Sequence, residues 1–148
     1  MLKINKKITL VNRTKLQNKR NMWIVIHYVG AVSSAKANAN YFYSENRKAS
    51  AHYFVDENEI WQVVEDCDGA WHIGGATKYF NSARNNNSIG IEMCCKKDAN
   101  GKLYIEDKTI KNTIELARYL AKLYNIDLRL YCCRHYDCTR QTMSETIC

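Results

Sequence analysis

The sequence predicts a single α/β domain in which helices flank a central, mixed β-sheet. Two observations lead to this prediction: apolar, strand-forming segments alternate with segments of helical periodicity, and one pair of short strands is joined by a tight polar turn. With 148 residues, 46% of them hydrophobic, the chain has the usual size and composition of one domain with one core. Residues 22–148 form the predicted domain, and residues 1–21 form a basic N-terminal arm.

The first half of the predicted domain holds a strand over residues 22–29, a helix from the cap Ser33-Ser34 to about Asn46, and a hairpin of strands over residues 50–56 and 59–65. The first strand is continuously apolar, as expected for the covered centre of a sheet, and Gly30 should end it. Serine is a preferred helix cap. In the polar turn of the hairpin, Asn58 can take a left-handed conformation.

The second half holds a strand over residues 89–94, a helix over residues 108–124 and a short strand that stops at His135. The helix has apolar residues near one side and Asp107 as its expected N-cap. The strand contains one carboxylate, Glu92, among apolar or small neighbours. A carboxylate in such a place requires a partner or a function.

The net charge of +7 comes from the N-terminal arm, because residues 1–20 contain basic residues and no acid while the rest is balanced. The simplest interpretation is a solvated arm. The alternatives are contact with nucleic acid, anionic lipid or an anionic wall polymer. No apolar segment of signal-peptide length follows the charges, and no apolar run is long enough for a membrane span.

The cysteines suit a reducing compartment better than a disulfide framework, because there are seven and they include the adjacent pairs Cys94-Cys95 and Cys132-Cys133. Adjacent residues of a strand point to opposite faces. One member of each pair is therefore expected to be a small buried hydrophobe. The sequence has no CxxC motif, so a metal thiolate would come from a single cysteine.

Four histidines are candidate metal ligands, and two of them end predicted strands. His27 ends the first strand and His135 the last, so neighbouring strands of one sheet can place both at the same edge. His52 lies within a predicted strand, and His72 lies in a loop.

These histidines belong to five short motifs. The motifs are Ile24-Val25-Ile26-His27-Tyr28, Ala49-Ser50-Ala51-His52-Tyr53, Ala70-Trp71-His72-Ile73-Gly74, Asn87-Ser88-Ile89-Gly90-Ile91-Glu92 and Arg134-His135-Tyr136-Asp137. Each motif alone is weakly specific. Together and in this order they resemble the zinc-dependent N-acetylmuramoyl-L-alanine amidases of phage endolysins and bacterial autolysins, which are related to animal peptidoglycan-recognition proteins.

The resemblance implies hydrolysis of the amide between N-acetylmuramic acid and the L-alanine of the stem peptide. It also implies that His27 and His135 share one Zn²⁺, whose bound water yields hydroxide near neutral pH. Glu92 matches a carboxylate that takes a proton from this water and passes it to the leaving amine. Positions that line the substrate groove or support the ligands are matched by His52, Trp71 and His72.

The C-terminal tail departs from the family pattern, which places a Cys-Pro pair eight residues after the second histidine. Position 143 is Met, and the chain contains no Pro. Five extra residues would restore the motif as Thr146-Ile147-Cys148, so Cys148 is the expected third ligand and Thr146 an expected oxyanion donor. The alternative ligands are Cys138 and Asp137. The covering segment of the family pattern is also missing, so the domain is expected to be truncated there.

The sequence therefore predicts a monomeric zinc amidase that acts on bacterial peptidoglycan, with no nucleic-acid partner. The alternative is a muropeptide-binding module whose altered tail has lost the zinc site. A weaker alternative is nucleic-acid binding through the basic arm. We expect synthesis in the cytoplasm without a signal peptide and action on the cell wall, as in a phage or prophage lysis enzyme.

Overall fold

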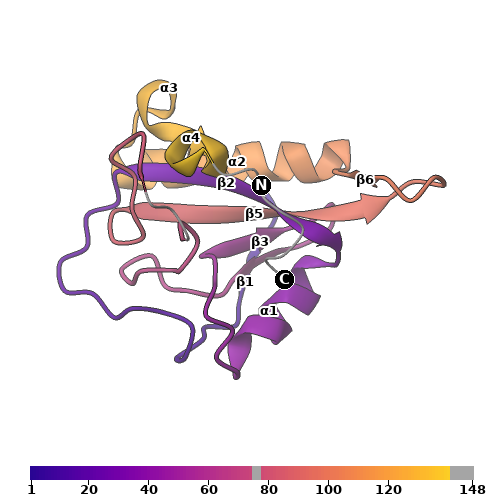
Figure 1. Cartoon of the computed structure of the whole chain (residues 1–148), viewed down its shortest axis with the longest axis horizontal. Coiled ribbons are helices and arrows are strands. Elements are labelled where there is room, and N and C mark those ends of the chain that lie inside the picture. The colour runs from indigo at the N-terminus through magenta and orange to yellow at the C-terminus, as the bar shows by residue number, and fades with distance from the viewer. Residues whose placement is uncertain (75–77, 141–148) are drawn as a thin grey trace.

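The computed structural model describes residues 1–74 and 78–140, which form a mixed sheet with helices on both faces (Figure 1). The strands are β1 (Ile4–Lys6), β2 (Trp23–Val32), β3 (Tyr53–Val55), β4 (Ile60–Gln62), β5 (Ser88–Lys97), β6 (Leu103–Tyr104) and β7 (Cys132–Arg134). The helices are α1 (Ala35–Tyr43), α2 (Asp107–Tyr124), α3 (Leu128–Tyr131) and α4 (His135–Thr139). The strand order is β1-β4-β3-β5-β2-β7, and β6 pairs with β5. The predicted fold class is confirmed.

The two faces of the sheet are covered by different helices. Alternate residues of β3 show the division, because Tyr53 packs with Leu116 and Leu120 of α2 whereas Phe54 packs with Phe42 of α1. Figure 1 shows α1 and α2 on opposite sides of the strands. None of the described helices is long and apolar enough to cross a membrane.

The two long strands β2 and β5 are parallel and form the centre of the sheet (Figure 1). Their register pairs Trp23 with Ser88 and His27 with Glu92. The predicted end of β2 at residue 29 is wrong, because the strand continues three residues further, to Val32. Gly30 has a φ of +74°, and it lies where the register shifts between Tyr28 and Val32.

The helix caps agree with the prediction at one helix and differ at the other. Ser34 caps α1, since its side chain accepts a hydrogen bond from the Ala37 amide. Helix α1 ends at Tyr43, earlier than predicted. At α2 the N-cap is Glu106, and Asp107 is the first helical residue, where its charge favours the helix dipole.

The predicted hairpin forms between β3 and β4, which are antiparallel. Its turn does not use a left-handed Asn58, because Asp56 Oδ1 accepts hydrogen bonds from the amides of Asn58 and Glu59 and stabilises a right-handed turn. His52 precedes β3 rather than lying within a strand.

The interpretation of the N-terminal segment as a solvated arm is wrong. Strand β1 pairs in parallel with β4, so the segment forms an edge of the sheet. Thr9 and Asn12 are fully buried, and the Asn12 amide donates to the carbonyls of Phe42 and Glu45. Polar side chains bonded to distant backbone atoms thus attach a segment that has few apolar residues.

Neither adjacent cysteine pair has one buried and one exposed member, because Cys132 and Cys133 are both partly buried and only their predicted placement on opposite faces is confirmed. Cys132 packs with the core on the α2 side, whereas Cys133 packs against the cluster that contains Trp23. Cys94 and Cys95 are both buried, because both faces of β5 are covered at that point. All cysteines of the described residues are free thiols.

Candidate metal and catalytic site

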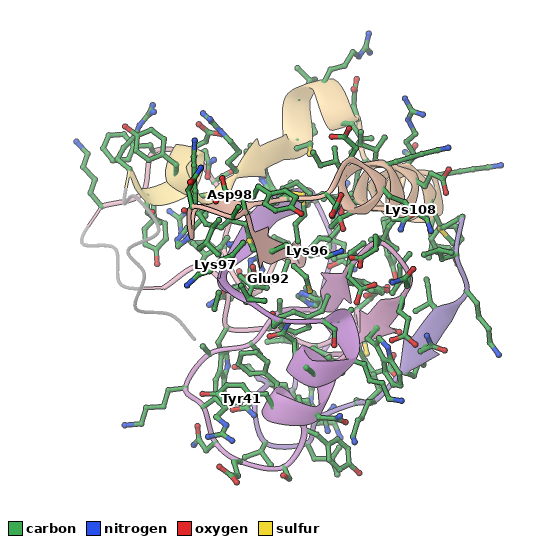
Figure 2. The ribbon with its side chains drawn as sticks, turned by 90° about the vertical axis from the view of Figure 1, so that its right-hand side faces the viewer. Tyr41, Glu92, Lys96, Lys97, Asp98 and Lys108 are labelled. Carbon is green, nitrogen blue, oxygen red and sulfur yellow. The ribbon has the colours of Figure 1, made fainter. Side chains whose placement is uncertain are left out.

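Three residues that are distant in sequence converge where β2, β5 and α4 meet. The register of β2 and β5 places His27 beside Glu92, with 3.9 Å between His27 Nδ1 and Glu92 Oε1. His135 begins α4 directly after β7, and its ring centroid lies 5.1 Å from that of His27. Figure 2 looks along β5 from its C-terminal end and shows Glu92 near the middle of the molecule. The structure thus brings together the three residues that were predicted to lie at one site.

The environment of the three groups favours neutral side chains. Burial, with a contribution from His135, lowers the pKa of His27 to about 3, and burial also lowers the pKa of His135. Burial raises the pKa of Glu92 to about 8. Neutral imidazoles are the form that binds metal ions, and a carboxylate of raised pKa is a better proton acceptor.

A polar atom of the site is also left without a partner. Glu92 Oε2 is buried and accepts no hydrogen bond from the described residues. Burying a carboxylate oxygen without a donor is costly, so the site is built to receive a group that can interact with it. The two neutral imidazoles supply two of the three protein ligands of a catalytic zinc site, and the carboxylate beside them can serve as the proton acceptor.

His72 is a buried neighbour of His27, so the structure favours the second of its two predicted roles, which is to support a ligand. Its Nδ1 lies 2.9 Å from His27 Nε2, and its Nε2 lies 3.0 Å from Ser88 Oγ. His72 is only 7% exposed, and both of its ring nitrogens already have a hydrogen-bond partner. The ring rests on Gly90, where a Cβ atom would come within 2.5 Å of His72 Cγ.

The side chain of His52 is completely buried, so its position also favours the supporting role over a place in the substrate groove. The Gly90 amide donates to His52 Nδ1 at 3.0 Å. His52 Nε2 lies 3.1 Å from the carbonyl oxygen of Asp68 and 3.0 Å from Lys19 Nζ. His52 therefore joins β5 to the loop that contains Asp68.

Lys19 is a member of this cluster that sequence reasoning missed. Its ammonium group donates to the carbonyls of Asp68 at 2.7 Å and Ser88 at 2.8 Å. Burial lowers the pKa of Lys19 to about 8. The sequence offers no signal for this role, because Lys19 stands in a run of basic and polar residues.

The loop that carries Trp71 is held by side chains that sequence reasoning also missed. Asn85 Oδ1 accepts hydrogen bonds from the amides of His72 and Ile73, and Ser50 Oγ accepts one from the Trp71 amide. The Trp71 ring is partly exposed, and its Nε1 donates to Thr14 Oγ1. A substrate contact for Trp71 stays a prediction.

The expected third ligand Cys148 and the expected donor Thr146 lie outside the described residues. Cys138 is fully buried, with its Sγ 3.4 Å from that of Cys133. The carboxylate of Asp137 pairs with the guanidinium of Arg134 at 3.0 Å. Within residues 1–74 and 78–140, no three His, Cys, Asp or Glu side chains are grouped to hold a metal ion. Cys148 therefore stays the predicted third ligand.

An α/β domain with this convergence of two histidines and a carboxylate defines a candidate metal-dependent hydrolase. Comparison with protein families identifies the particular family of hydrolases. Residues 17–148 match the Amidase_2 family, described as N-acetylmuramoyl-L-alanine amidase. The chain belongs to the N-acetylmuramoyl-L-alanine amidase family.

Individual relatives agree with this assignment. A probable N-acetylmuramoyl-L-alanine amidase of Bacillus licheniformis is 31% identical over 144 residues, which cover 91% of this chain and 39% of the relative. The chain spans about two fifths of the length of the curated relatives it matches. The catalytic domain of XlyA is 27% identical with a TM-score of 0.74, covering 91% of this chain and 85% of that domain. The E. coli amidase AmiD, solved with anhydro-N-acetylmuramic acid-L-Ala-D-gamma-Glu-L-Lys, is 28% identical with a TM-score of 0.60, covering 80% and 49%.

Proposed function

We propose that this chain hydrolyses the amide between N-acetylmuramic acid and the L-alanine of the peptidoglycan stem peptide. The observation that carries the proposal is the register of β2 and β5, which sets His27 against Glu92 with His135 beside them. Membership of the amidase family gives the bond that such a site would cleave. The site of action is then the bacterial cell wall.

Each residue has a distinct role in this reaction. His27, His135 and Cys148 would hold Zn²⁺, which supplies a water of pKa near 7 and polarises the scissile carbonyl. Glu92 takes a proton from the attacking water and gives it to the departing amine of L-alanine. Burial of Glu92 favours its protonated form and so helps it to hold that proton between the two transfers. Thr146 would donate to the developing oxyanion.

The proposal is tested with the full chain and purified cell walls. The protein should contain about one zinc ion and release alanine amino termini without new reducing sugar ends. Replacing the base by Glu92→Gln should slow this release by about 10²–10⁴-fold and leave the zinc content unchanged. The matched control is Glu65→Gln, a carboxylate that pairs with Lys6 at the surface. Zinc-loaded protein that frees no amine from susceptible walls would refute the amidase function.

A second candidate function is a muropeptide-binding module without turnover. The observation that favours it is the tail, where position 143 is Met and the described residues group no third ligand. This function predicts binding to walls that is unaffected by Glu92→Gln and no amine release when zinc is added. Loss of both zinc and hydrolysis in Cys148→Ala would instead support the amidase.

A further inference from the structure

The hydrogen bonds behind His27 form a chain in which each donor is fixed by the next acceptor, and the last acceptor is a backbone carbonyl. Ser88 Oγ lies 2.6 Å from the carbonyl oxygen of Arg84. A carbonyl can only accept, so the single proton of the Ser88 hydroxyl is donated to Arg84. The Ser88 oxygen must then accept from His72 Nε2, which lies 3.0 Å away. His72 therefore carries a proton on Nε2.

The same argument continues to the metal-facing histidine. Burial favours the neutral form of His72, and a neutral imidazole has one proton. With that proton on Nε2, Nδ1 of His72 is an acceptor, so His27 Nε2 donates to it across 2.9 Å. His27 in turn has no proton on Nδ1, the atom that lies 3.9 Å from Glu92 Oε1.

We infer that His72 is a positioning residue that holds His27 in the Nε2-protonated tautomer, so that its Nδ1 lone pair faces Glu92 and is the atom that binds the metal. The inference deepens the proposed function and rests on it. Partners on the far nitrogen of a ligating histidine commonly fix its tautomer and orientation, and their loss costs 10- to 100-fold in metal affinity or activity.

The fold holds the His72 ring in this position from two sides. Gly90 of β5 lies directly against the ring, where the approach leaves no room for a Cβ. Asn85 accepts hydrogen bonds from the backbone amides of His72 and Ile73, which fixes the loop from which the ring extends. The ring is thus clamped between a strand and an anchored loop, as a positioning residue requires.

The inference is tested first on the unaltered chain. In protein labelled with ¹⁵N at histidine, long-range ¹⁵N–¹H correlation spectra of the zinc-free chain should show His27 protonated at Nε2. On adding zinc, the resonance of His27 Nδ1 should shift while Nε2 keeps its proton. A proton on Nδ1 of His27 in the zinc-free chain, or a zinc-dependent loss of the Nε2 proton, would overturn the inference without any variant.

Two substitutions of His72 separate positioning from packing. His72→Asn places an amide oxygen near the position of Nδ1 and can still accept from His27, whereas His72→Gln places its amide near Nε2 and leaves His27 without an acceptor. His72→Gln should weaken zinc binding by about 10- to 100-fold, measured by competition with a chromophoric chelator. His72→Asn should stay close to the unaltered chain.

The two proposals fail in distinguishable ways. Equal zinc affinity and an unchanged His27 tautomer in His72→Gln would refute the positioning role even if the walls are hydrolysed. Absence of hydrolysis in the unaltered chain, with the expected tautomer and the expected loss of affinity, would refute only the amidase function. Ser88→Ala provides a milder variant, because it removes the acceptor of His72 and should let the tautomers of His72 and His27 mix.

Discussion

The site has two sides that are built differently. His27 and Glu92 lie on β2 and β5, two strands of ten residues each that run side by side in the middle of the sheet. His135 follows β7, a strand of three residues, and begins α4, a helix of five. The first side is fixed by the sheet and by buried imidazoles, whereas the second depends on short elements near residue 140.

Local interactions hold the second side. Arg134 and Asp137 cap α4, with Asp137 Oδ2 accepting a hydrogen bond from the Arg134 amide at 3.0 Å. Cys138, a buried residue of α4, packs against Cys133. Because exposed ion pairs and single caps contribute little, we expect the His27 side to be the stable part of the site and the His135 side the adjustable part.

The largest effect is expected from Gly90→Ala, which tests how tightly the His27 side is packed. The added Cβ would come within 2.5 Å of the His72 ring, so the ring or the strand must move. Overpacking of this kind costs about 1–3 kcal/mol of unfolding free energy, measured by denaturant titration. The matched control is Gly74→Ala, where a Cβ meets nothing within 4 Å. Equal stability of the two variants would show that the buried imidazoles are loosely packed.

The second test uses the pH dependence of stability. Burial lowers the pKa of Lys19 to about 8, whereas an unfolded lysine titrates near 10.4. Between pH 8 and 10 the unfolded chain binds more protons, so the free energy of unfolding rises with pH. Relative to Lys19→Met, the unaltered chain should gain about 1–2 kcal/mol between pH 7.5 and 9.5.

The control for this pH dependence is Lys15→Met, which removes an exposed lysine of the same segment. That variant should keep the rise in stability. If Lys19→Met also keeps it, Lys19 is not held against His52 as the structure places it, and the His27 side loses one of its anchors.

Sequence reasoning was successful where the structure depends on short-range pattern. Apolar strands that end in a histidine were sufficient to predict that His27 and His135 lie at one edge of the sheet, whereas the place of Glu92 beside them came from the resemblance to the amidase family. The buried polar partners could not be predicted this way. Asn12 and Lys19 are hydrogen-bonded to backbone atoms far along the chain, and a polar residue in a polar segment gives no sign of such a partner.

A smaller effect is expected on the second side from Asp137→Ala. The substitution removes the oxygen that accepts from the Arg134 amide and thus one cap of α4. A helix cap is worth about 0.5–1 kcal/mol, so the unfolding midpoint should fall by only a few degrees. Arg134→Met keeps that backbone hydrogen bond and should have less effect. A loss as large as that of Gly90→Ala would show that both sides contribute equally.

The smallest effect is expected from Cys138→Ala, on the affinity for zinc. Cys138 lies three residues after His135, but its side chain is buried beside Trp23 and Val25 rather than beside His27. Cys138→Ala should therefore leave the zinc affinity unchanged, while Cys148→Ala weakens it, both measured by chelator competition. A loss of zinc binding in Cys138→Ala with none in Cys148→Ala would mean that α4 turns its inner face toward the site when the metal binds. The adjustable side of the site would then supply two of the three ligands by itself.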